Sequence, residues 1–444
     1  MSQYRAYPAY KDSGIEWIGQ VPEHWKIAQI KRISALNPRK STLSEEKDSL
    51  CTFLPMEKLR TNAVTLDETR PIHEVYGGYS YFCDGDILIA KVTPCFENGN
   101  IAIANGLVNG IGFGSTEINV LRVNGKGHNR FLYYRLQEEQ FRTIAKSEMR
   151  GTGGLKRVPT DLFESFTIGL PDTDEQATIA ATLDRETARI DALIEKKNRF
   201  VELLKEKRQG LITHAVTKGL DRNAKMKDSG IEWIGQVPEH WEATKLKHVA
   251  AFSGGGTPSK ENPDYWNGCI PWVSPKDMKH EVITDSIDHI TTKGLENSAT
   301  KLIDSGAVLL VARSGILRHT IPVGINNVPV SLNQDMKALS LDETRVRPRF
   351  ILRWVQGLNR SLLVFGEKVG HTVESFEHEY VANTRLPLPD LKEQDAILAT
   401  LDLETARIDA LISKSEQSIT LLKERRAAFI TAAVTGQIDL RGKQ

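Results

Sequence analysis

Two polar stretches in the first half of the chain carry side chains that could contact nucleic acid. The first follows the apolar run DILIA and contains a proline, and the second is the glycine-rich basic segment RGTGGLKR. Basic and amide side chains bond to phosphates and base edges, and glycine lets a backbone approach a phosphate closely. The alternative is that both are solvated loops without function. The candidate DNA-binding residues are Lys91, Thr93, Glu97, Asn98, Arg150, Thr152, Lys156 and Arg157.

The second half of the chain offers a comparable set, spread over several segments. Gly254, Gly255 and Gly256 could hold the backbone against a phosphate, or could simply form a turn. Trp266 is a further candidate, although it could instead be a buried packing aromatic, and Trp272 is expected to pack in the interior. The candidate DNA-binding residues of this half are Thr257, Ser259, Lys260, Tyr265, Lys276, Arg313, Ser314, Asn333, Gln334, Lys368 and His371.

No constellation of residues indicates catalysis. The NPDY segment at 262–265 lacks the second proline of the loop with which adenine methyltransferases hold a flipped base. The GxGxG match at Gly110, Gly112 and Gly114 is isolated and is better explained by turns. The sequence contains no GxxxxGK[ST], HExxH or GxSxG segment. We therefore predict no catalytic residue, no metal site and no cofactor bound by this chain.

Bulk composition limits the function classes. The 58 basic and 57 acidic residues leave a net charge of +1, so any basic face for a nucleic acid must be local. No run approaches the roughly 18 apolar residues of a membrane span, and the N-terminus has no apolar signal core. We expect a cytoplasmic protein without a membrane partner. The four cysteines form no CxxC pair, which predicts reduced, buried thiols.

Most of the organisation comes from an internal repeat. Residues 11–25 read KDSGIEWIGQVPEHW, and residues 227–241 are identical. LDRETARIDALI at 183–194 returns as LDLETARIDALI at 401–412, an offset of 218 (401 minus 183). This period is far longer than the roughly 20 to 50 residues of a solenoid unit, so the chain contains two whole domains of similar plan. The tryptophans of the identical segment, Trp17, Trp25, Trp233 and Trp241, are predicted to be core anchors.

Two long amphipathic helices are predicted at 174–217 and 392–435, where apolar residues recur with a helical period. Asp172 or Asp174 and Asp390 could cap their N-termini. Each helix needs a partner for its apolar stripe, and its twin is the nearest candidate, which predicts an antiparallel pair. Two separate surface helices are the alternative.

The inserts at about 26–172 and 242–389 are predicted to be mixed α/β. We expect strands at 86–92, 117–123, 307–312 and 335–341, and helices at 131–145 and 350–364. The fold class is therefore α/β (α+β), with two domains joined by two long antiparallel helices and a pseudo-twofold internal repeat. The predicted divisions are 1–173 and 221–391 for the domains with their frame segments, 174–220 for the first spacer helix, and 392–444 for the second helix and tail.

Several of these segments together resemble the specificity subunit of type I restriction–modification systems. The resemblance rests on WIGQVPEHW at 17–25 and 233–241, and on the LPDTDEQATIAATLD and LPLPDLKEQDAILATLD segments that lead into the ARIDALI helices. The insert segments YFCDGDILIAKVTPCFENG and SGGGTPSKENPDYWNGCIPWVSPKDM resemble target-recognition domains of two subclasses. The resemblance covers essentially the whole chain.

The resemblance implies a subunit without catalysis of its own. Each insert would read one half of a bipartite, asymmetric double-stranded DNA site, while the helical pair sets the gap and docks two modification (methyltransferase) subunits. Restriction subunits with translocase and nuclease activity would join them, and AdoMet, ATP and Mg would bind to these partners. The candidate docking residues, whose alternative role is a solvated helix face, are Glu186, Arg189, Lys197, Glu404, Arg407 and Arg425.

Two other functions remain open. A coiled-coil scaffold that joins two protein partners would read no DNA, but it would not need two divergent inserts that each carry a glycine-rich basic loop. A self-contained adenine methyltransferase would need an AdoMet pocket, for which the sequence gives no support.

Overall fold

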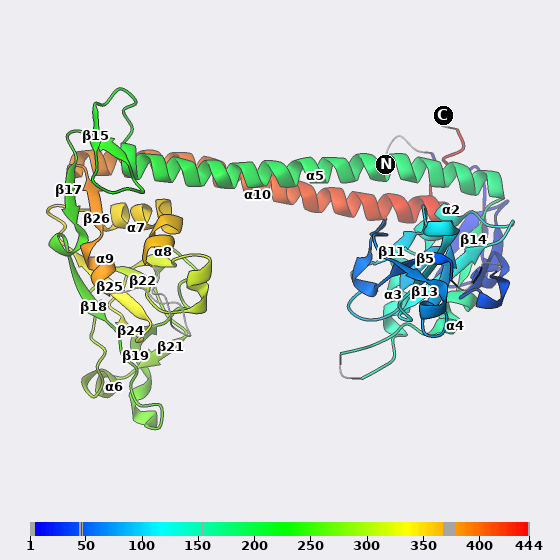
Figure 1. The fold of residues 1–444 in the computed structure, drawn as a ribbon, viewed down its shortest axis with the longest axis horizontal. Helices are drawn as coiled ribbons and strands as arrows, with labels where there is room; N and C mark the ends of the chain where they lie inside the picture. The colour runs from blue at the N-terminus through cyan, green and yellow to red at the C-terminus, as the bar shows by residue number, and fades with distance from the viewer. Residues whose placement is uncertain (1–4, 44–45, 47, 153, 367–377, 443–444) are drawn as a thin grey trace. The chain divides into compact units, whose positions relative to one another are not determined.

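Each copy of the repeated segment belongs to its own unit (Figure 1). The computed structural model describes residues 5–43, 46, 48–152, 154–366 and 378–442. Unit 1 comprises Met1–Lys197 and Gln417–Gln444, and unit 2 comprises Asn198–Glu416. Both units contain helices and strands, so the predicted α/β class is confirmed.

The two long helices are α5 (Thr173–Lys218) and α10 (Leu391–Val434), within one residue of the predicted bounds. Asp172 caps α5 by accepting a hydrogen bond from the backbone N–H of Glu175 at 2.8 Å, and Asp390 caps α10 through Glu393 N–H at the same distance. Gly219, with a φ of 71°, follows α5 directly and ends it in the left-handed conformation that glycine favours.

Within each unit, part of α5 runs antiparallel to part of α10. In unit 1, Asp191 of α5 pairs with Arg426 of α10 at 3.0 Å. In unit 2, Arg208 of α5 pairs with Asp409 of α10 at 3.0 Å. The two ion pairs are the same interaction seen twice, because Asp409 and Arg426 each lie 218 positions after Asp191 and Arg208. The expected antiparallel pairing is therefore present in both units.

The repeated segment folds identically in the two units, as two small antiparallel sheets. The second sheet pairs the strand that enters the insert with the strand that leaves it, so the two ends of each insert lie together. The strands of unit 1 are β1 (Tyr10–Asp12), β2 (Gln20–Pro22), β3 (Lys26–Gln29) and β14 (Thr167–Leu170). Those of unit 2 are β15 (Met226–Asp228), β16 (Gln236–Pro238), β17 (Glu242–Lys245) and β26 (Arg385–Leu388).

A buried tryptophan ties each frame to the first turn of a long helix. Trp25 Nε1 donates to Glu175 Oε1 at 3.2 Å, and Trp241 Nε1 donates to Glu393 Oε2 at 3.1 Å. The histidine before each tryptophan contacts the same glutamate, at 2.7 and 2.8 Å. Both tryptophans are completely buried, so their predicted role as core anchors is confirmed.

Some expectations of burial are wrong. Trp17 is 44% exposed, because its ring lies on the surface against Phe166, at a centroid distance of 6.1 Å. Its copy Trp233 is only partly buried. Among the cysteines, Cys51 is buried and free, but Cys269 is exposed in a strand that faces solvent on one side, and the other two are partly buried.

The insert of unit 1 contains two four-stranded sheets. One has the order β11-β10-β13-β4 and the other β8-β5-β12-β9. The predicted strands at 86–92 and 117–123 are confirmed as β10 and β13. The first sheet consists of β11 (Ile101–Ile103), β10 (Ile87–Ala90), β13 (Ile118–Val123) and β4 (Ser34–Leu36). The second consists of β8 (Thr69–Pro71), β5 (Leu50–Leu54), β12 (Ile111–Gly114) and β9 (Ser80–Cys83), and a short pair adds β6 (Leu59–Arg60) and β7 (Ala63–Val64).

The GxGxG segment is a strand, not the predicted cluster of turns. Gly112 and Gly114 lie inside β12, between β5 and β9. A Cβ on Gly112 would lie 2.2 Å from the ring of Phe82, so the glycine makes room for that buried ring. Only Gly110, with a φ of 68°, fits the turn interpretation.

The insert of unit 2 contains a five-stranded sheet and a three-stranded sheet, which include the predicted strands at 307–312 and 335–341. In Figure 1, β19, β21 and β24 lie at the end of unit 2 away from α5. The larger sheet is formed, in order, by β18 (Ala250–Gly254), β25 (Met336–Leu341), β22 (Val308–Val311), β23 (Val323–Asn326) and β20 (Val282–Ile283). The smaller is formed by β21 (Asp288–Ile290), β19 (Trp266–Val273) and β24 (Ser331–Leu332).

Each predicted insert helix is broken in two. In unit 1 the break falls before Glu138, whose extended backbone and side chain cap the next helix through the N–H groups of Gln140 and Phe141. In unit 2 the helix ends at Gly357, which packs against Val216 of α5 so closely that a Cβ would come within 3.0 Å of it. The helices are α1 (Ile72–Val75), α2 (Asn129–Arg135), α3 (Glu139–Ser147), α4 (Thr160–Ser165), α6 (Thr292–Glu296), α7 (Pro348–Gly357), α8 (Asn359–Gly366) and α9 (His378–Asn383).

Candidate nucleic-acid interface

In unit 1, the two stretches predicted to bind DNA lie side by side. Where β10 ends, Lys91 N donates to the carbonyl of Glu117, the residue before β13, at 3.0 Å. The chain then pairs with the basic segment: Thr93 N donates to Lys156 O at 2.9 Å, and Val158 N donates to Lys91 O at 2.8 Å. The structure therefore brings the two predicted stretches to one edge of the sheet.

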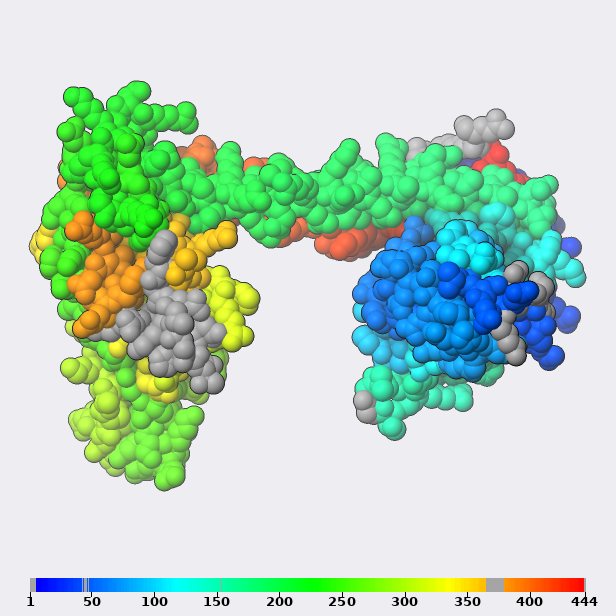
Figure 2. All heavy atoms as spheres, in the orientation of Figure 1, coloured from blue at the N-terminus to red at the C-terminus, as the bar shows by residue number. Residues whose placement is uncertain are grey.

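A threonine fastens the glycine-rich loop to this edge. The Thr93 hydroxyl donates to Gly154 O at 2.6 Å and accepts from Lys156 N at 3.0 Å. The side chains of Arg150, Thr152 and Lys156 remain exposed. Figure 2 shows this segment, in teal, protruding from the surface of unit 1 on the side away from α5. Thr93 thus holds the loop, while the basic side chains face solvent.

Glu97 and Asn98 occupy a tight loop held from behind by an arginine that the sequence did not indicate. Both side chains are exposed. Arg142 of α3 donates from Nη2 to the carbonyl of Glu97 at 2.7 Å, and Thr61 donates to the carbonyl of Gly99 at 2.8 Å. Burial lowers the pKa of the Arg142 guanidinium. The loop is thereby fixed through its backbone, which leaves the two polar side chains available.

Arg157 is not a free basic residue, because it forms a bidentate pair with Glu117. Its Nε donates to Oε2 at 2.8 Å and its Nη2 donates to Oε1 at 2.7 Å. This hydrogen-bonded ion pair lowers the pKa of the Glu117 carboxyl and keeps it ionised. The sequence analysis did not identify Glu117 as a candidate, because nothing in the sequence around it indicates an ion pair with an arginine 40 residues away.

Unit 2 has an edge of the same construction. Where β22 ends, Ala312 N donates to the carbonyl of Asp335, the residue before β25, at 2.7 Å. Arg313 Nε donates to Asp335 Oδ1 at 2.6 Å, and Asn333 Nδ2 donates to Asp335 Oδ2 at 3.1 Å. Ser314 caps the short helix that follows, through Ile316 N–H. Two predicted residues, Arg313 and Asn333, therefore meet at an aspartate that was not predicted.

The glycine-rich segment of unit 2 packs against its own domain. Gly256 N donates to Leu332 O at 2.9 Å, and a Cβ on Gly255 would lie 2.0 Å from the carbonyl of Asn333. These glycines allow close approach of two protein segments, and a phosphate contact by this backbone stays a prediction. Close packing brings Thr257 to Gln334, and their side chains form a hydrogen bond.

The remaining candidates of unit 2 lie between β18 and β19 or just beyond β19. Trp266 donates to the carbonyl of Ser259 at 3.0 Å and packs against Trp272, whose Nε1 donates to Gly256 O at 2.9 Å. Trp272 is buried, as predicted. Lys260 and Lys276 are exposed and Tyr265 is partly exposed. Lys368 and His371 lie outside the described residues.

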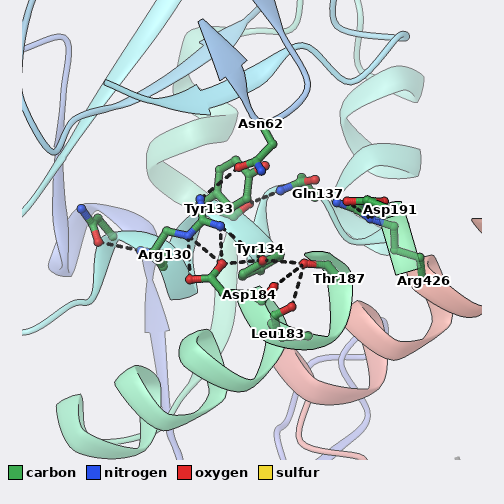
Figure 3. Close-up of polar contacts among 11 residues, drawn as sticks. Asn62, Arg130, Tyr133, Tyr134, Gln137, Leu183, Asp184, Thr187, Asp191 and Arg426 are labelled. Carbon is green, nitrogen blue, oxygen red and sulfur yellow. Dashed lines mark hydrogen bonds and ion pairs between the residues drawn. The ribbon is translucent and has the colours of Figure 1, made fainter. Parts of the chain in front are cut away.

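A polar cluster fastens each insert to a long helix, and Figure 3 shows the cluster of unit 1. In unit 1, Arg130 Nε donates to Asp184 of α5 at 2.9 Å, and the Tyr134 hydroxyl donates to the same carboxylate at 2.6 Å. In unit 2 the counterpart is Arg349 Nη2, which donates to Asp402 of α10 at 2.6 Å. Because Asp184 and Asp402 occupy the same place in the repeat, the two inserts are attached by one mechanism.

The repeated helical segments 183–194 and 401–412 are buried in the same pattern, residue by residue. Arg189 and Leu193 are exposed on α5, and so are their copies Arg407 and Leu411 on α10. Leu193 is 42% exposed and Leu411 is 47% exposed, although the helical period predicts both for the apolar stripe. The two units therefore present the same exposed side chains over this segment, except that Arg185 is replaced by Leu403.

Among the described residues, no group of three or more His, Cys, Asp or Glu side chains could hold a metal ion. Over the same residues, no helix is both long and apolar enough to cross a membrane.

Comparison with known proteins decides what these units are. Residues 22–203 and 238–421 each match the family described as type I restriction modification DNA specificity domain. Each match starts in a frame segment and ends in a long helix, and together they span most of the chain. The chain belongs to this family. The predicted resemblance to type I specificity subunits is confirmed.

Several named specificity subunits are similar in sequence. The chain is 31% identical over 225 residues to the type I restriction enzyme EcoR124I/EcoR124II specificity subunit of Escherichia coli. The aligned region covers 50% of this chain and 48% of that protein. The chain spans only 28% of the EcoEI specificity subunit, so it covers about half or less of the first curated relatives it matches. The putative MjaX specificity subunit of Methanocaldococcus jannaschii is 22% identical, with 96% of both chains covered.

Solved structures share the fold of this specificity-domain protein. A chain from a structure entitled "Structural basis underlying complex assembly and conformational transition of the type I R-M system" aligns with a TM-score of 0.76 at 17% identity, covering 94% of this chain and 99% of that one. The HsdS subunit of Thermoanaerobacter tengcongensis aligns with a TM-score of 0.58 at 18% identity, over 94% and 98% of the two chains. At such identities the likeness concerns the fold alone.

Proposed function

We propose that this chain is the DNA-recognition subunit of a type I restriction–modification complex, in which each unit reads one half of a bipartite, asymmetric double-stranded site. The observation that carries the proposal is the paired edge: the same position of the same sheet presents polar side chains in both units, but different ones. The repeated frame segments, by contrast, are identical in the two units. Two readers of unlike sequence on one frame would recognise two unlike half-sites.

The side chains at the two edges suit base and phosphate contacts. Arginine and lysine bind phosphates and guanine, and asparagine and glutamine pair with adenine in the major groove. In unit 1 the exposed basic residues lie on the protruding segment that ends at Arg157. In unit 2, Gln334 and Arg313 are exposed next to the held Asp335. This local basic character is compatible with a net charge of +1.

The long helices are suited to fix the gap between the half-sites. α5 and α10 run through both units without interruption, over 46 and 44 residues. Each would be about 65 to 70 Å long at 1.5 Å per residue. The Arg130–Asp184 and Arg349–Asp402 pairs fasten the inserts to these helices, so a change of helix length would be transmitted to the readers.

The repeated exposed residues support docking of two copies of one partner, the modification subunit. A surface that serves only solvation would be free to differ between the two copies, yet Arg189 and Leu193 recur as Arg407 and Leu411. The other candidate docking residues, Glu186, Lys197, Glu404 and Arg425, are exposed or partly exposed. In this proposal the methyltransferase and restriction subunits bring AdoMet, ATP and Mg, and the chain itself supplies no catalysis.

We expect Leu193→Asp to remove one modification subunit and Leu411→Asp to remove the other. Each leucine is about half exposed, so the introduced carboxylate should leave the fold intact. Its burial in an interface would cost free energy, because a charged group loses its hydration there, and docking should be weakened. Native mass spectrometry of the coexpressed complex should show two partner copies for the unaltered chain and one for either single variant. The double variant should bind none. Phe200→Ser is the matched control, because its repeat position is already Ser418; two copies bound to the double variant would contradict docking at these residues.

The function itself is tested by sequencing methylated DNA from a methylation-null host that expresses this chain with a candidate modification subunit. The expected result is N6-methyladenine in a single split motif with a fixed gap. A stable complex of the two proteins without any methylation motif would favour the scaffold alternative. Crosslinking of AdoMet to this chain alone would revive the enzyme alternative.

A further inference from the structure

The two candidate edges share a feature that neither the repeat nor the family description assigns. In each, an arginine is held by the carboxylate that immediately precedes a central strand, Glu117 before β13 and Asp335 before β25. The two carboxylates occupy the same sheet position, because β10 pairs with β13 as β22 pairs with β25. The arginines come from different segments, Arg157 from the glycine-rich loop and Arg313 from the end of β22. The carboxylates are therefore equivalent in the two units, whereas the arginines that they hold are not.

The contacts leave the outer edge of each guanidinium available. Arg157 uses Nε and one N–H of Nη2 for Glu117, and its Nη1 has no hydrogen-bond partner among the described residues. Arg313 uses Nε for Asp335, whose other oxygen is held by Asn333. The side chains of the two arginines are still 47% and 52% exposed. Glu117 thus holds the Arg157 guanidinium through two hydrogen bonds, and Asp335 holds that of Arg313 through one. In both arginines, Nη1 and at least one N–H of Nη2 have no partner among the described residues.

A fixed guanidinium of this kind matches guanine better than it matches a phosphate. The Nη1 and Nη2 groups form a planar fork that can donate to O6 and N7 of guanine at once, and only guanine offers two acceptors there. A phosphate contact needs no such orientation, and a carboxylate beside it would reduce the attraction. An arginine that is already held in the free protein also loses less side-chain entropy when it binds.

We propose that Arg157 and Arg313 each read one guanine in the major groove, and that Glu117 and Asp335 are the positioning residues that orient them. This inference rests on the proposed function, since it requires that the two edges face DNA. It names a base for each half-site: one G·C pair read by unit 1 and one read by unit 2.

The test uses the full chain in complex with its modification subunits and a duplex library in which one half-site at a time is randomised. Glu117→Gln and Arg157→Lys should relax the requirement for guanine at a single position of the first half-site by roughly 5- to 140-fold, the discrimination of a bidentate pair. 7-Deazaguanine at that position should weaken binding of the unaltered complex and leave binding of Arg157→Lys nearly unchanged. The second half-site, read by an unaltered unit, reports that the complex is folded.

Lys156→Ala is the matched control, because Lys156 is an exposed neighbour with no ion pair on its side chain among the described residues. It should weaken all sequences alike and reduce the salt slope by about one contact. If Arg157→Lys and Glu117→Gln leave the base preference at every position of the first half-site unchanged, the inference is wrong, although the bipartite function stands. Failure of the unaltered complex to recognise any split motif would overturn the proposed function and this inference with it.

Discussion

Adding four residues to both long helices at matched points should lengthen the gap between the half-sites by about two base pairs and leave both half-sites unchanged. Four helical residues add about 6 Å, and duplex DNA rises roughly 3.4 Å per base pair. The readers themselves are untouched, because every contact that fastens an insert to its helix lies outside the inserted turn. Methylation sequencing gives the gap and both half-sites in one measurement.

The structure determines where the matched points lie. The residue numbers of the two interhelical ion pairs add to the same value, 617 (191 and 426; 208 and 409), so Leu204 lies opposite about position 413. Insertions after Leu204 in α5 and after Ser413 in α10 fall between the two ion pairs and preserve both. The repeat counterpart of Leu204 is Leu422, which is not its neighbour in an antiparallel pair.

A one-sided insertion after Leu204 is the control. It shifts α5 by one turn against α10, so that Arg208 no longer meets Asp409 and buried apolar residues such as Leu204 lose their partners. We expect lower thermal stability and weaker methylation rather than a longer gap. If the matched double insertion is stable and the gap is unchanged, the helices do not set the spacing.

The long helices could be predicted to within a residue because their signal is local and is repeated. The apolar period runs over more than ten turns, and Asp172 and Asp390 supply caps at the expected places. The strands β10 and β13 were equally accessible, since each is a short apolar run bounded by polar residues. Elements that depend on residues close to one another in the chain were thus predicted correctly from the sequence.

The failures have a common physical cause, which is that tertiary contacts decide them. Gly357, the last residue of α7, leaves room for Val216 of α5, and Gly112 inside β12 leaves room for the ring of Phe82. Neither neighbour is near in sequence. Glu117 was overlooked as a functional residue for the same reason: it acquires its role only when Arg157 reaches it.

The candidate interface was predicted in its parts but not in its construction. Lys91 and Thr93 were chosen from one stretch and Lys156 from another, and the structure joins the two stretches through backbone hydrogen bonds. Thr93 then proves to use its hydroxyl for the loop, so its contribution to DNA binding would be indirect. Whether each remaining side chain touches DNA stays a prediction.

Replacing residues 242–389 by the matching part of the chain's own first insert, residues 26–171, should give a subunit that reads the first half-site twice and has lost the second. The graft is favourable because both ends of the insert meet in one small sheet, where Glu242 pairs with Leu388. The donor also carries Arg130, which can pair with Asp402 as it does with Asp184. The frame tryptophans and the long helices remain those of the unaltered chain.

The expected effect is large, because each mismatched base pair costs about 1 to 3 kcal/mol of specific binding and a whole half-site is exchanged. The measurement is methylation sequencing, with the same graft carrying Asp402→Ala as the control for attachment. That control lacks the acceptor for the guanidinium, so it should weaken methylation without changing the motif. An altered first half-site in the graft would contradict the independence of the two readers, since nothing in unit 1 differs between the graft and the unaltered chain.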